Sequence, residues 1–227
     1  MRTPSTTQSR SAPETGVLRA QQLYCERDDR VLFAGLDFAL QPGELLQVKG
    51  SNGSGKTTLL RIICGLNDNF EGALFWQQQP LPEVREEFLA SLLYIGHKVG
   101  VNKVLSPREN LRWSTSLQAG TRTLGIEEAL ALTGLAGYED VPCHNLSAGQ
   151  QQRVSLARLH LSQACLWVLD EPFTTLDVHG VAALEALLDE HVRAGGMALV
   201  TTHHRLQLAC SIRELNLDTA STQGEVV

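Results

Sequence analysis

The first part of the chain alternates apolar and polar residues, as strands do when they bury one face. This alternation covers residues 31–33 and 36–40, within a stretch from 17 to about 45, and Pro42-Gly43 reads as a turn. A period of two bounded by turn residues predicts antiparallel strands. From about residue 163 onward, apolar runs alternate with helical patterns such as 181–192. That order favours an α/β core.

The middle of the chain, from about 86 to 155, lacks the rhythm of parallel strands. Residues 107–113 and 126–132 have the apolar spacing of helices, so this part is predicted to form a helical lobe inserted in the α/β core. Residues 17–227 are predicted to form one domain. The start, residues 1–16, is rich in Ser, Thr and Pro without an apolar core, which predicts a disordered tail rather than a signal peptide.

One glycine-rich segment carries a specific chemical signal. Gly50-Ser51-Asn52-Gly53-Ser54-Gly55-Lys56-Thr57 fits the phosphate-binding pattern G-x-x-x-x-G-K-[ST], with a predicted strand at 44–49 before it and a predicted helix from Thr58 after it. In that context backbone N–H groups surround a phosphate at the positive end of a helix. The ammonium of Lys56 is expected at the β- and γ-phosphates, and the Thr57 hydroxyl is expected to ligate Mg²⁺.

A second signal lies about 110 residues downstream. The apolar run 166–169 is followed by Asp170, Glu171 and Pro172, and the stretch Leu-Ser-Ala-Gly-Gln at 146–150 precedes it, before a predicted helix at 151–160. A carboxylate at the end of a strand can hold Mg²⁺, which assigns Asp170 to the metal together with Thr57. The next carboxylate, Glu171, is placed to polarise an attacking water.

This order of motifs resembles the ATP-binding cassette superfamily over nearly the whole chain. The resemblance implies a P-loop fold with a mixed sheet core, N-terminal antiparallel strands and an inserted helical lobe. It also implies a homodimer of cassettes that encloses two ATP molecules. The signature element of one subunit would then meet the γ-phosphate held by the other. The matching signature residues here are Ser147, Ala148, Gly149 and Gln150.

Two further positions follow from the same resemblance. Asp177 ends Thr-Thr-Leu-Asp, in the slot of the loop that communicates across the dimer. His203 follows the apolar stretch 197–200 and matches the histidine that contacts the γ-phosphate. His204 is adjacent and leaves the register open, although the position at the strand end favours His203. The nucleotide base is expected on either Arg27 or Tyr24, since an arginine plane can also stack on a base.

Closer features resemble one family, the ATP-binding subunit of bacterial cytochrome c maturation (haem exporter) systems, called CcmA. They are Cys25 to Arg30, the tetrapeptide Tyr-Ile-Gly-His at 94–97 and the segment 166–180. The superfamily normally carries glutamine where this chain has His97. Because Mg²⁺ prefers oxygen ligands, His97 is expected to act through water or in coupling. The segment 97–105 is where a membrane subunit is expected to dock.

Composition restricts the remaining choices. A net charge of −6 argues against a nucleic-acid binder, and no uninterrupted apolar run approaches the roughly 20 residues that span a bilayer. If the chain drives transport, another polypeptide must therefore supply the membrane path. The family resemblance implies that the partners are integral membrane subunits of a haem-handling complex, with this chain at the cytoplasmic face of the bacterial inner membrane. Five cysteines without a C-x-x-C pair fit reduced thiols, and no direct haem ligation is expected.

Two other functions remain open from the sequence. The chain could be the ATPase of another small-molecule transporter, or a soluble cassette scaffold of the kind used in iron–sulfur assembly. Both would retain the nucleotide motifs. The first differs in its membrane partners, and the second would not bind membranes.

Overall fold

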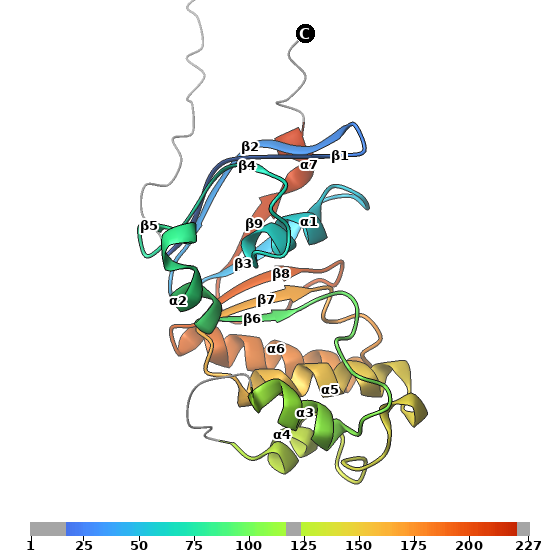
Figure 1. Ribbon diagram of the computed structural model, residues 1–227. Helices are drawn as coiled ribbons and strands as arrows, with labels where there is room; N and C mark the ends of the chain where they lie inside the picture. The colour runs from blue at the N-terminus through green and yellow to red at the C-terminus, as the bar shows by residue number, and fades with distance from the viewer. Residues whose placement is uncertain (1–16, 117–123, 222–227) are drawn as a thin grey trace, which may run out of the picture.

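A computed structural model of the chain describes residues 17–116 and 124–221. The predicted tail at 1–16 lies outside the described residues. The described part is layered, with an antiparallel sheet at one end, a parallel sheet in the middle and most helices at the other end (Figure 1). The predicted α/β fold with N-terminal antiparallel strands is confirmed.

The strands of the described residues form two separate sheets. An antiparallel sheet has the order β2-β1-β4-β5, and a parallel sheet has the order β6-β7-β8-β3-β9. Their bounds are β1 Leu18–Arg27, β2 Arg30–Leu40, β3 Leu45–Lys49, β4 Glu71–Trp76, β5 Gln79–Pro80, β6 Leu92–Ile95, β7 Leu166–Asp170, β8 Met197–Thr201 and β9 Ile212–Asn216. Strands β3 and β7 were predicted before and after the helical region. They thus lie in one sheet, with β8 between them.

Helices cover both faces of the parallel sheet. Their bounds are α1 Lys56–Ile63, the 3₁₀ turn η1 Leu81–Val84, α2 Arg85–Ala90, α3 Pro107–Ser116, α4 Ile126–Leu132, the 3₁₀ turn η2 Cys143–Asn145, α5 Ala148–Leu161, α6 Val178–Arg193 and α7 Leu217–Ser221.

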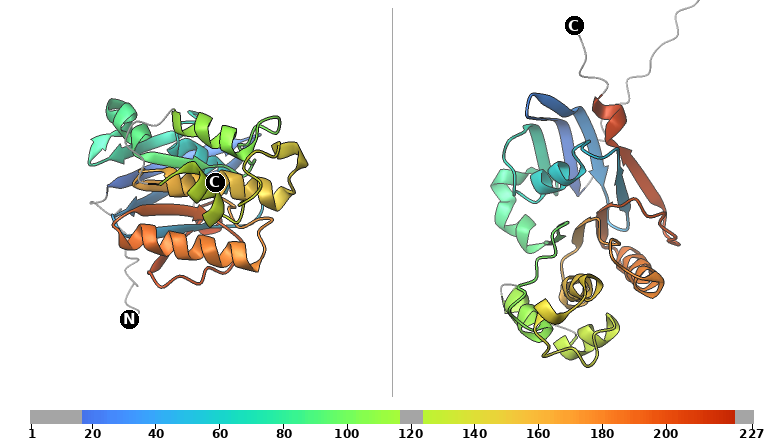
Figure 2. Two further views of the ribbon diagram at one scale, coloured as in Figure 1. Left: turned by 90° about the horizontal axis from the view of Figure 1, so that it is seen from below. Right: turned by 90° about the vertical axis from the view of Figure 1, so that its right-hand side faces the viewer.

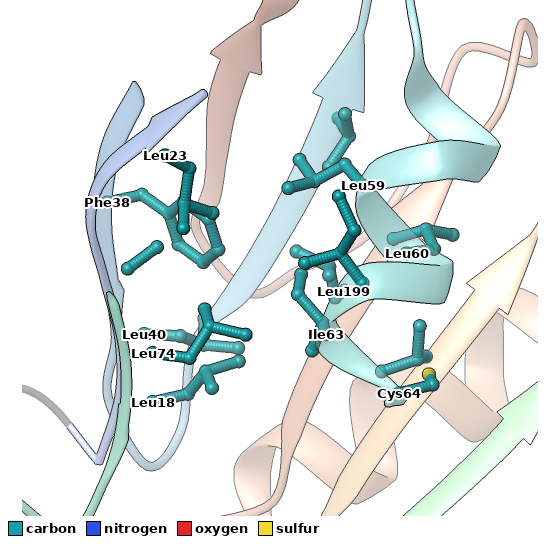
Figure 3. Close-up of a cluster of buried hydrophobic side chains, with 14 of the residues drawn as sticks. Leu18, Leu23, Phe38, Leu40, Leu59, Leu60, Ile63, Cys64, Leu74 and Leu199 are labelled. Carbon is teal, nitrogen blue, oxygen red and sulfur yellow. The ribbon is translucent and has the colours of Figure 1, made fainter. Parts of the chain in front are cut away.

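Helix α1 lies between the two sheets and holds them together. Its apolar residues Leu59, Leu60, Ile62 and Ile63 are all buried. They belong to one cluster with side chains from the antiparallel sheet and from β3, β7 and β8, part of which is shown in Figure 3. Since the phosphate loop leads directly into α1, this cluster also fixes the position of the loop.

The central strands of the parallel sheet are buried on both faces. Every residue of β7 and β8 is buried, whereas the edge strand β9 has no fully buried residue. A parallel strand with helices on both sides reads as a continuous apolar run rather than an alternating one. The second face of this sheet packs on α5 and α6 through a separate apolar cluster. The carboxyl ends of β7 and β8 are therefore held by packing from both sides.

The predicted helical region differs from the structure at its start. The range 86–155 contains most of α2 and all of β6, and β6 pairs in parallel with β7 as an edge of the core sheet. The strand was missed because it has only four residues and lies between two helices. The helical part proper consists of α3, α4 and α5, which share a third apolar cluster and lie at the end of the molecule remote from the antiparallel sheet (Figure 2, right).

Leu199 tests how strongly the inter-sheet core supports the fold. Its side chain is fully buried in β8 (Figure 3), so Leu199→Ala should lower the free energy of unfolding by about 2–5 kcal/mol, through lost apolar contact and a residual cavity. The measurement is urea unfolding followed by circular dichroism. Leu132→Ala is the matched control, because Leu132 is 54% exposed and should change stability by less than about 0.5 kcal/mol. Equal losses for both variants would contradict this assignment of the core.

Candidate nucleotide site

The carboxyl ends of the parallel strands surround a cavity of about 750 Å³. In open parallel sheets, ligands bind at this edge. The phosphate loop forms one wall, and residues from β1, β2, β7 and the loops after β6 and β8 form the rest. The lining consists of Arg27, Asp28, Arg30, Leu32, Asn52, Gly53, Gly55, Lys56, Thr57, Thr58, His97, Asp170, Glu171, Thr174 and His203. Of the predicted loop residues, Gly50, Ser51 and Ser54 do not line it.

The loop conformation depends on glycine at the start of α1. Gly55 is the N-cap residue and has a φ of +98°, a value that other residues rarely adopt. A Cβ atom there would also lie 3.0 Å from the Leu32 Cβ atom. The backbone N–H groups of the first helical turn are thus presented to the cavity, where an anion would satisfy them.

Lys56 is held over the same loop. Its Nζ atom donates hydrogen bonds to the carbonyl oxygens of Gly50, at 2.8 Å, and Ser51, at 3.0 Å. An ammonium has three donors, so one remains for a ligand in the cavity. The side chain is therefore positioned before any phosphate arrives.

Asp170 lies at the centre of the strand ends and is 1% exposed. Its two carboxylate oxygens each accept a hydrogen bond at 2.8 Å, one from the Thr57 hydroxyl and one from the Thr201 hydroxyl. The predicted metal residues Thr57 and Asp170 are thus in direct contact. A hydroxyl and a carboxylate side by side next to a phosphate loop are hard oxygen donors of the kind that Mg²⁺ prefers, so the residues present fit that ion.

Glu171 differs from Asp170 in having a free carboxylate oxygen. Its backbone N–H donates to the carbonyl and hydroxyl oxygens of Thr201, at 3.1 and 2.9 Å, and its φ is +52°. This turn directs the side chain into the cavity. There its Oε1 atom is buried and accepts no hydrogen bond from the described residues. An unpartnered buried carboxylate oxygen is costly and is expected where a ligand or water supplies the donor.

The two adjacent histidines have different surroundings. His203 lines the cavity and is mostly exposed, with its Nε2 atom 3.6 Å from the Glu171 Oε1 atom. His204 points away: its Nε2 atom lies 3.1 Å from the Glu185 carboxylate, and its ring packs against Phe173. The geometry therefore favours His203 as the residue that meets a bound phosphate.

Of the other residues predicted to contact the nucleotide, only some line the cavity. Arg27 lines the cavity, whereas Tyr24 does not, and the Tyr24 hydroxyl donates to the Glu26 carboxylate at 2.8 Å. That hydrogen bond raises the pKa of Tyr24. Of the two residues predicted to contact the nucleotide base, only Arg27 therefore lies at the cavity. His97, after β6, also lines the cavity.

The signature residues lie away from this cavity. Ser147 caps α5 by accepting a hydrogen bond from the Gln150 N–H at 3.2 Å, while the Gln150 side chain accepts from the Ser147 N–H at 2.9 Å. Of the signature residues Ser147, Ala148, Gly149 and Gln150, none lines the chain's own cavity. They therefore cannot complete the nucleotide site of their own chain. The predicted dimer requires this, because there the signature residues act on the site of the other subunit.

The signature helix is tied to the predicted dimer loop. The Arg153 guanidinium of α5 pairs with the Asp177 carboxylate at 2.6 Å, and Asp177 also caps α6 through the Gly180 N–H. These two interactions hold the pKa of Asp177 below its usual value, the capping bond more than the ion pair. A Cβ atom on Gly149 would lie 2.8 Å from the Thr175 carbonyl oxygen. These contacts hold the signature helix and the loop against each other.

Comparisons with known proteins agree with this site. Residues 33–174 match the ABC transporter family. The chain is 49% identical, over 92% of its length and 99% of the relative's, to a cytochrome c biogenesis ATP-binding export protein CcmA from Hahella chejuensis. It is also 49% identical to the protein of that name from Escherichia coli K12, over 89% of this chain and 97% of that one. This chain belongs to the CcmA family.

A solved structure supports the fold independently. An ATP-binding cassette in a dimeric post-hydrolysis state, bound to ADP and phosphate, superposes with a TM-score of 0.72 at 20% identity, covering 82% of this chain and 88% of that one. Membership of the CcmA family makes the chain an ATPase of the ATP-binding cassette type. No helix within the described residues is long and apolar enough to cross a bilayer.

Two residues of this CcmA-family site were missed in the sequence. Thr201 forms hydrogen bonds with both Asp170 and Glu171, and its only signal was its position at the end of an apolar run. Asp218, at the start of α7, accepts hydrogen bonds from the Ser51 N–H at 3.0 Å and the Ser51 hydroxyl at 2.9 Å. No local pattern identifies a contact across 167 residues.

Gly149 provides a test of the contact between signature and dimer loop. Gly149→Ala should lower the free energy of unfolding by about 1–3 kcal/mol, because the added methyl group would force α5 or the Thr175 carbonyl to move. Thermal and urea unfolding would measure it. Gly125→Ala is the control, since a Cβ atom there meets only the Glu127 carboxylate at 3.8 Å. Unchanged stability for Gly149→Ala would mean that this contact is not tight.

Proposed function

We propose that this chain is the ATP-hydrolysing subunit of a membrane complex for c-type cytochrome maturation. In this proposal, ATP binding and hydrolysis drive either export of haem or release of a haem-loaded chaperone. The observation that carries the hydrolytic part is the Glu171 carboxylate, which lines the phosphate-loop cavity and whose buried Oε1 atom accepts no hydrogen bond from the described residues. The cytochrome part is supported by two relatives named as cytochrome c biogenesis ATP-binding export proteins, which are 49% identical to this chain over 92% and 89% of its length.

The hydrolytic step uses positioning and charge. The loop amides and Lys56 would hold the phosphates, and Glu171 would accept a proton from a water that its free oxygen orients at the γ-phosphorus. His203, 3.6 Å from that oxygen, would donate to the γ-phosphate. Thr57 and Asp170 would hold Mg²⁺, which offsets negative charge on the phosphates when bound. Arg27 would pack against the base.

A homodimer is needed to complete each site. Ser147 and Gly149 stand at the N-terminal end of a 14-residue helix, where backbone N–H groups and the helix dipole attract an anion. Because these residues lie outside their own chain's cavity, they would meet the γ-phosphate of the partner subunit. ATP would therefore close the dimer, and the Asp177 loop would move with the signature helix.

A groove on the helical side supports a membrane partner. It has a volume of about 400 Å³ between the core sheet and α3 and α5. Gly100 and Val101 of the predicted docking segment line it, as do the exposed side chains of Leu66 and Trp113. Exposed apolar residues that gather around a groove mark an interaction surface. The partner would be an integral membrane subunit, and the chain would then lie at the cytoplasmic face of the inner membrane.

Glu171→Gln tests the hydrolytic assignment. The amide keeps the size of the side chain but is a far weaker base, so turnover should fall by about 10²–10⁴ while ATP affinity is retained. Steady-state phosphate release and calorimetric titration with ATP measure the two quantities. Turnover near that of the wild type would refute the role of Glu171. Lys56→Ala is the comparison variant and should lose ATP affinity as well, because it removes the positive charge that would bind the phosphates.

The cytochrome role is tested in cells. In a strain lacking this gene, a haem-stained gel should show no c-type cytochromes, and the wild-type gene should restore them while Glu171→Gln should not. If both genes restored the c-type cytochromes, cytochrome maturation would not depend on ATP turnover by this chain. Normal bands without the gene, in a strain shown to have a single maturation route, would contradict the cytochrome role and leave the ATPase with another cargo.

A further inference from the structure

Two residues that line the docking groove each have a buried polar atom that forms no hydrogen bond within the described part of the chain. The Nε atom of Arg158 and the Oγ atom of Ser155 are both inaccessible to water, and neither has a hydrogen-bond partner among the described residues. The two residues are three apart on α5, so they lie on the same face of the helix, and both line the groove. Each unpaired buried polar group normally costs stability and calls for an explanation.

Arg158 differs from two other partly buried arginines of the described residues. Arg108 pairs with Asp140 and Glu127, and Arg153 pairs with Asp177. Arg158 forms no ion pair within the described residues, and no Asp or Glu is among those that line the groove. Burial lowers the pKa of the Arg158 guanidinium, yet arginine stays protonated in proteins. An uncompensated positive charge therefore lies in a mostly apolar groove.

The groove also selects the kind of ligand. Most of its walls are apolar, with Trp113 65% and Leu66 54% exposed at its rim, which fits the apolar face of an amphipathic helix. An acceptor with more than one oxygen can take the hydrogen bonds of both Arg158 and Ser155. A carboxylate meets this requirement, and its charge offsets that of the guanidinium.

We propose that Arg158, together with Ser155, binds the carboxylate of an acidic side chain on a cytosolic helical segment of the membrane subunit. This inference rests on the proposed function and specifies the partner's docking segment. The segment 117–123 of this chain contains no Asp or Glu, so it cannot supply the carboxylate. Binding there would also reach the nucleotide cavity, because Tyr94 lines the groove and His97, three residues on, lines that cavity.

The first experiment measures binding to the membrane subunits. Purified full-length chain is added to inverted membrane vesicles from a strain that lacks this chain but expresses those subunits, and the bound fraction is measured by sedimentation. Arg158→Glu should bind at least about 30-fold more weakly, as expected for loss of one member of a buried charge pair. Arg158→Lys should bind with intermediate affinity, because it keeps the charge but not the planar fork.

Controls separate a specific contact from general attraction and from misfolding. Arg112→Glu makes the same charge change on α3, at an exposed residue outside the groove lining, and should bind within about threefold of the wild type, as a surface substitution does. Arg158→Met should fold with an unchanged or higher melting temperature, since it removes an unpaired buried charge, and should still lose vesicle binding. Normal binding by Arg158→Met and Arg158→Glu would overturn the inference while leaving the proposed function intact.

A second experiment identifies the occupant of the groove. The photo-crosslinker p-benzoylphenylalanine replaces Trp113, and peptides captured in the vesicles are sequenced. A membrane-subunit peptide containing Asp or Glu, whose change to Arg restores binding of Arg158→Glu, is the expected result. Capture of residues 1–16, of the C-terminal residues 222–227 or of a second copy of this chain would overturn the inference. If the wild-type chain fails to bind the vesicles at all, the membrane-coupled function itself is contradicted, and the inference with it.

Discussion

The paired hydrogen bonds of Asp170 are the interaction on which the site depends. A buried carboxylate is tolerated only where donors replace water, and here the donors come from Thr57 on α1 and Thr201 on β8. One side chain thereby aligns the end of β7, the start of α1 and the end of β8. Thr201 extends the alignment, because it also accepts the backbone N–H of Glu171. The free carboxylate oxygen of Glu171 is placed by this chain of contacts.

Rigid packing surrounds this centre, and two residues with a left-handed backbone conformation follow it in the chain. Helix α1 is fixed between two sheets, and β7 and β8 are buried along their whole length. Glu171 and Thr175, by contrast, have φ values of +52° and +69°. Such conformations persist only where the surroundings enforce them, and they cluster at functional sites. Here they lie at the two ends of the turn that begins with the predicted general base, Glu171. The same turn ends at Thr175, whose carbonyl oxygen lies close to Gly149 of the signature element.

The chain holds two halves of different sites. Its phosphate loop and carboxylates form one half. The signature helix and the Asp177 loop form the other half, and the Arg153–Asp177 ion pair joins these two elements to each other. At the end of β6, Tyr94 lines the docking groove and His97 lines the nucleotide cavity. Gly96 lies between them, and a Cβ atom there would come within 2.8 Å of the Tyr94 hydroxyl. A partner in the groove and a nucleotide in the cavity would thus contact one short segment from opposite ends.

The local sequence determined the parts of the site that are contiguous. The phosphate loop, the Asp170-Glu171 pair and the signature element each combine a few residues with an adjacent strand or helix, so their spacing alone predicts the chemistry. The local sequence could not decide between Arg27 and Tyr24 for the nucleotide base, or between His203 and His204 for the γ-phosphate. Residues close together on one strand or turn point in different directions. Only the tertiary structure placed Thr201 against Asp170, Asp218 against Ser51 and the four-residue strand β6 in the core sheet. It also left Arg158 without an ion pair among the residues that the structure describes. These features depend on contacts between residues distant in the chain, and such contacts leave no periodicity or motif in the sequence around either residue.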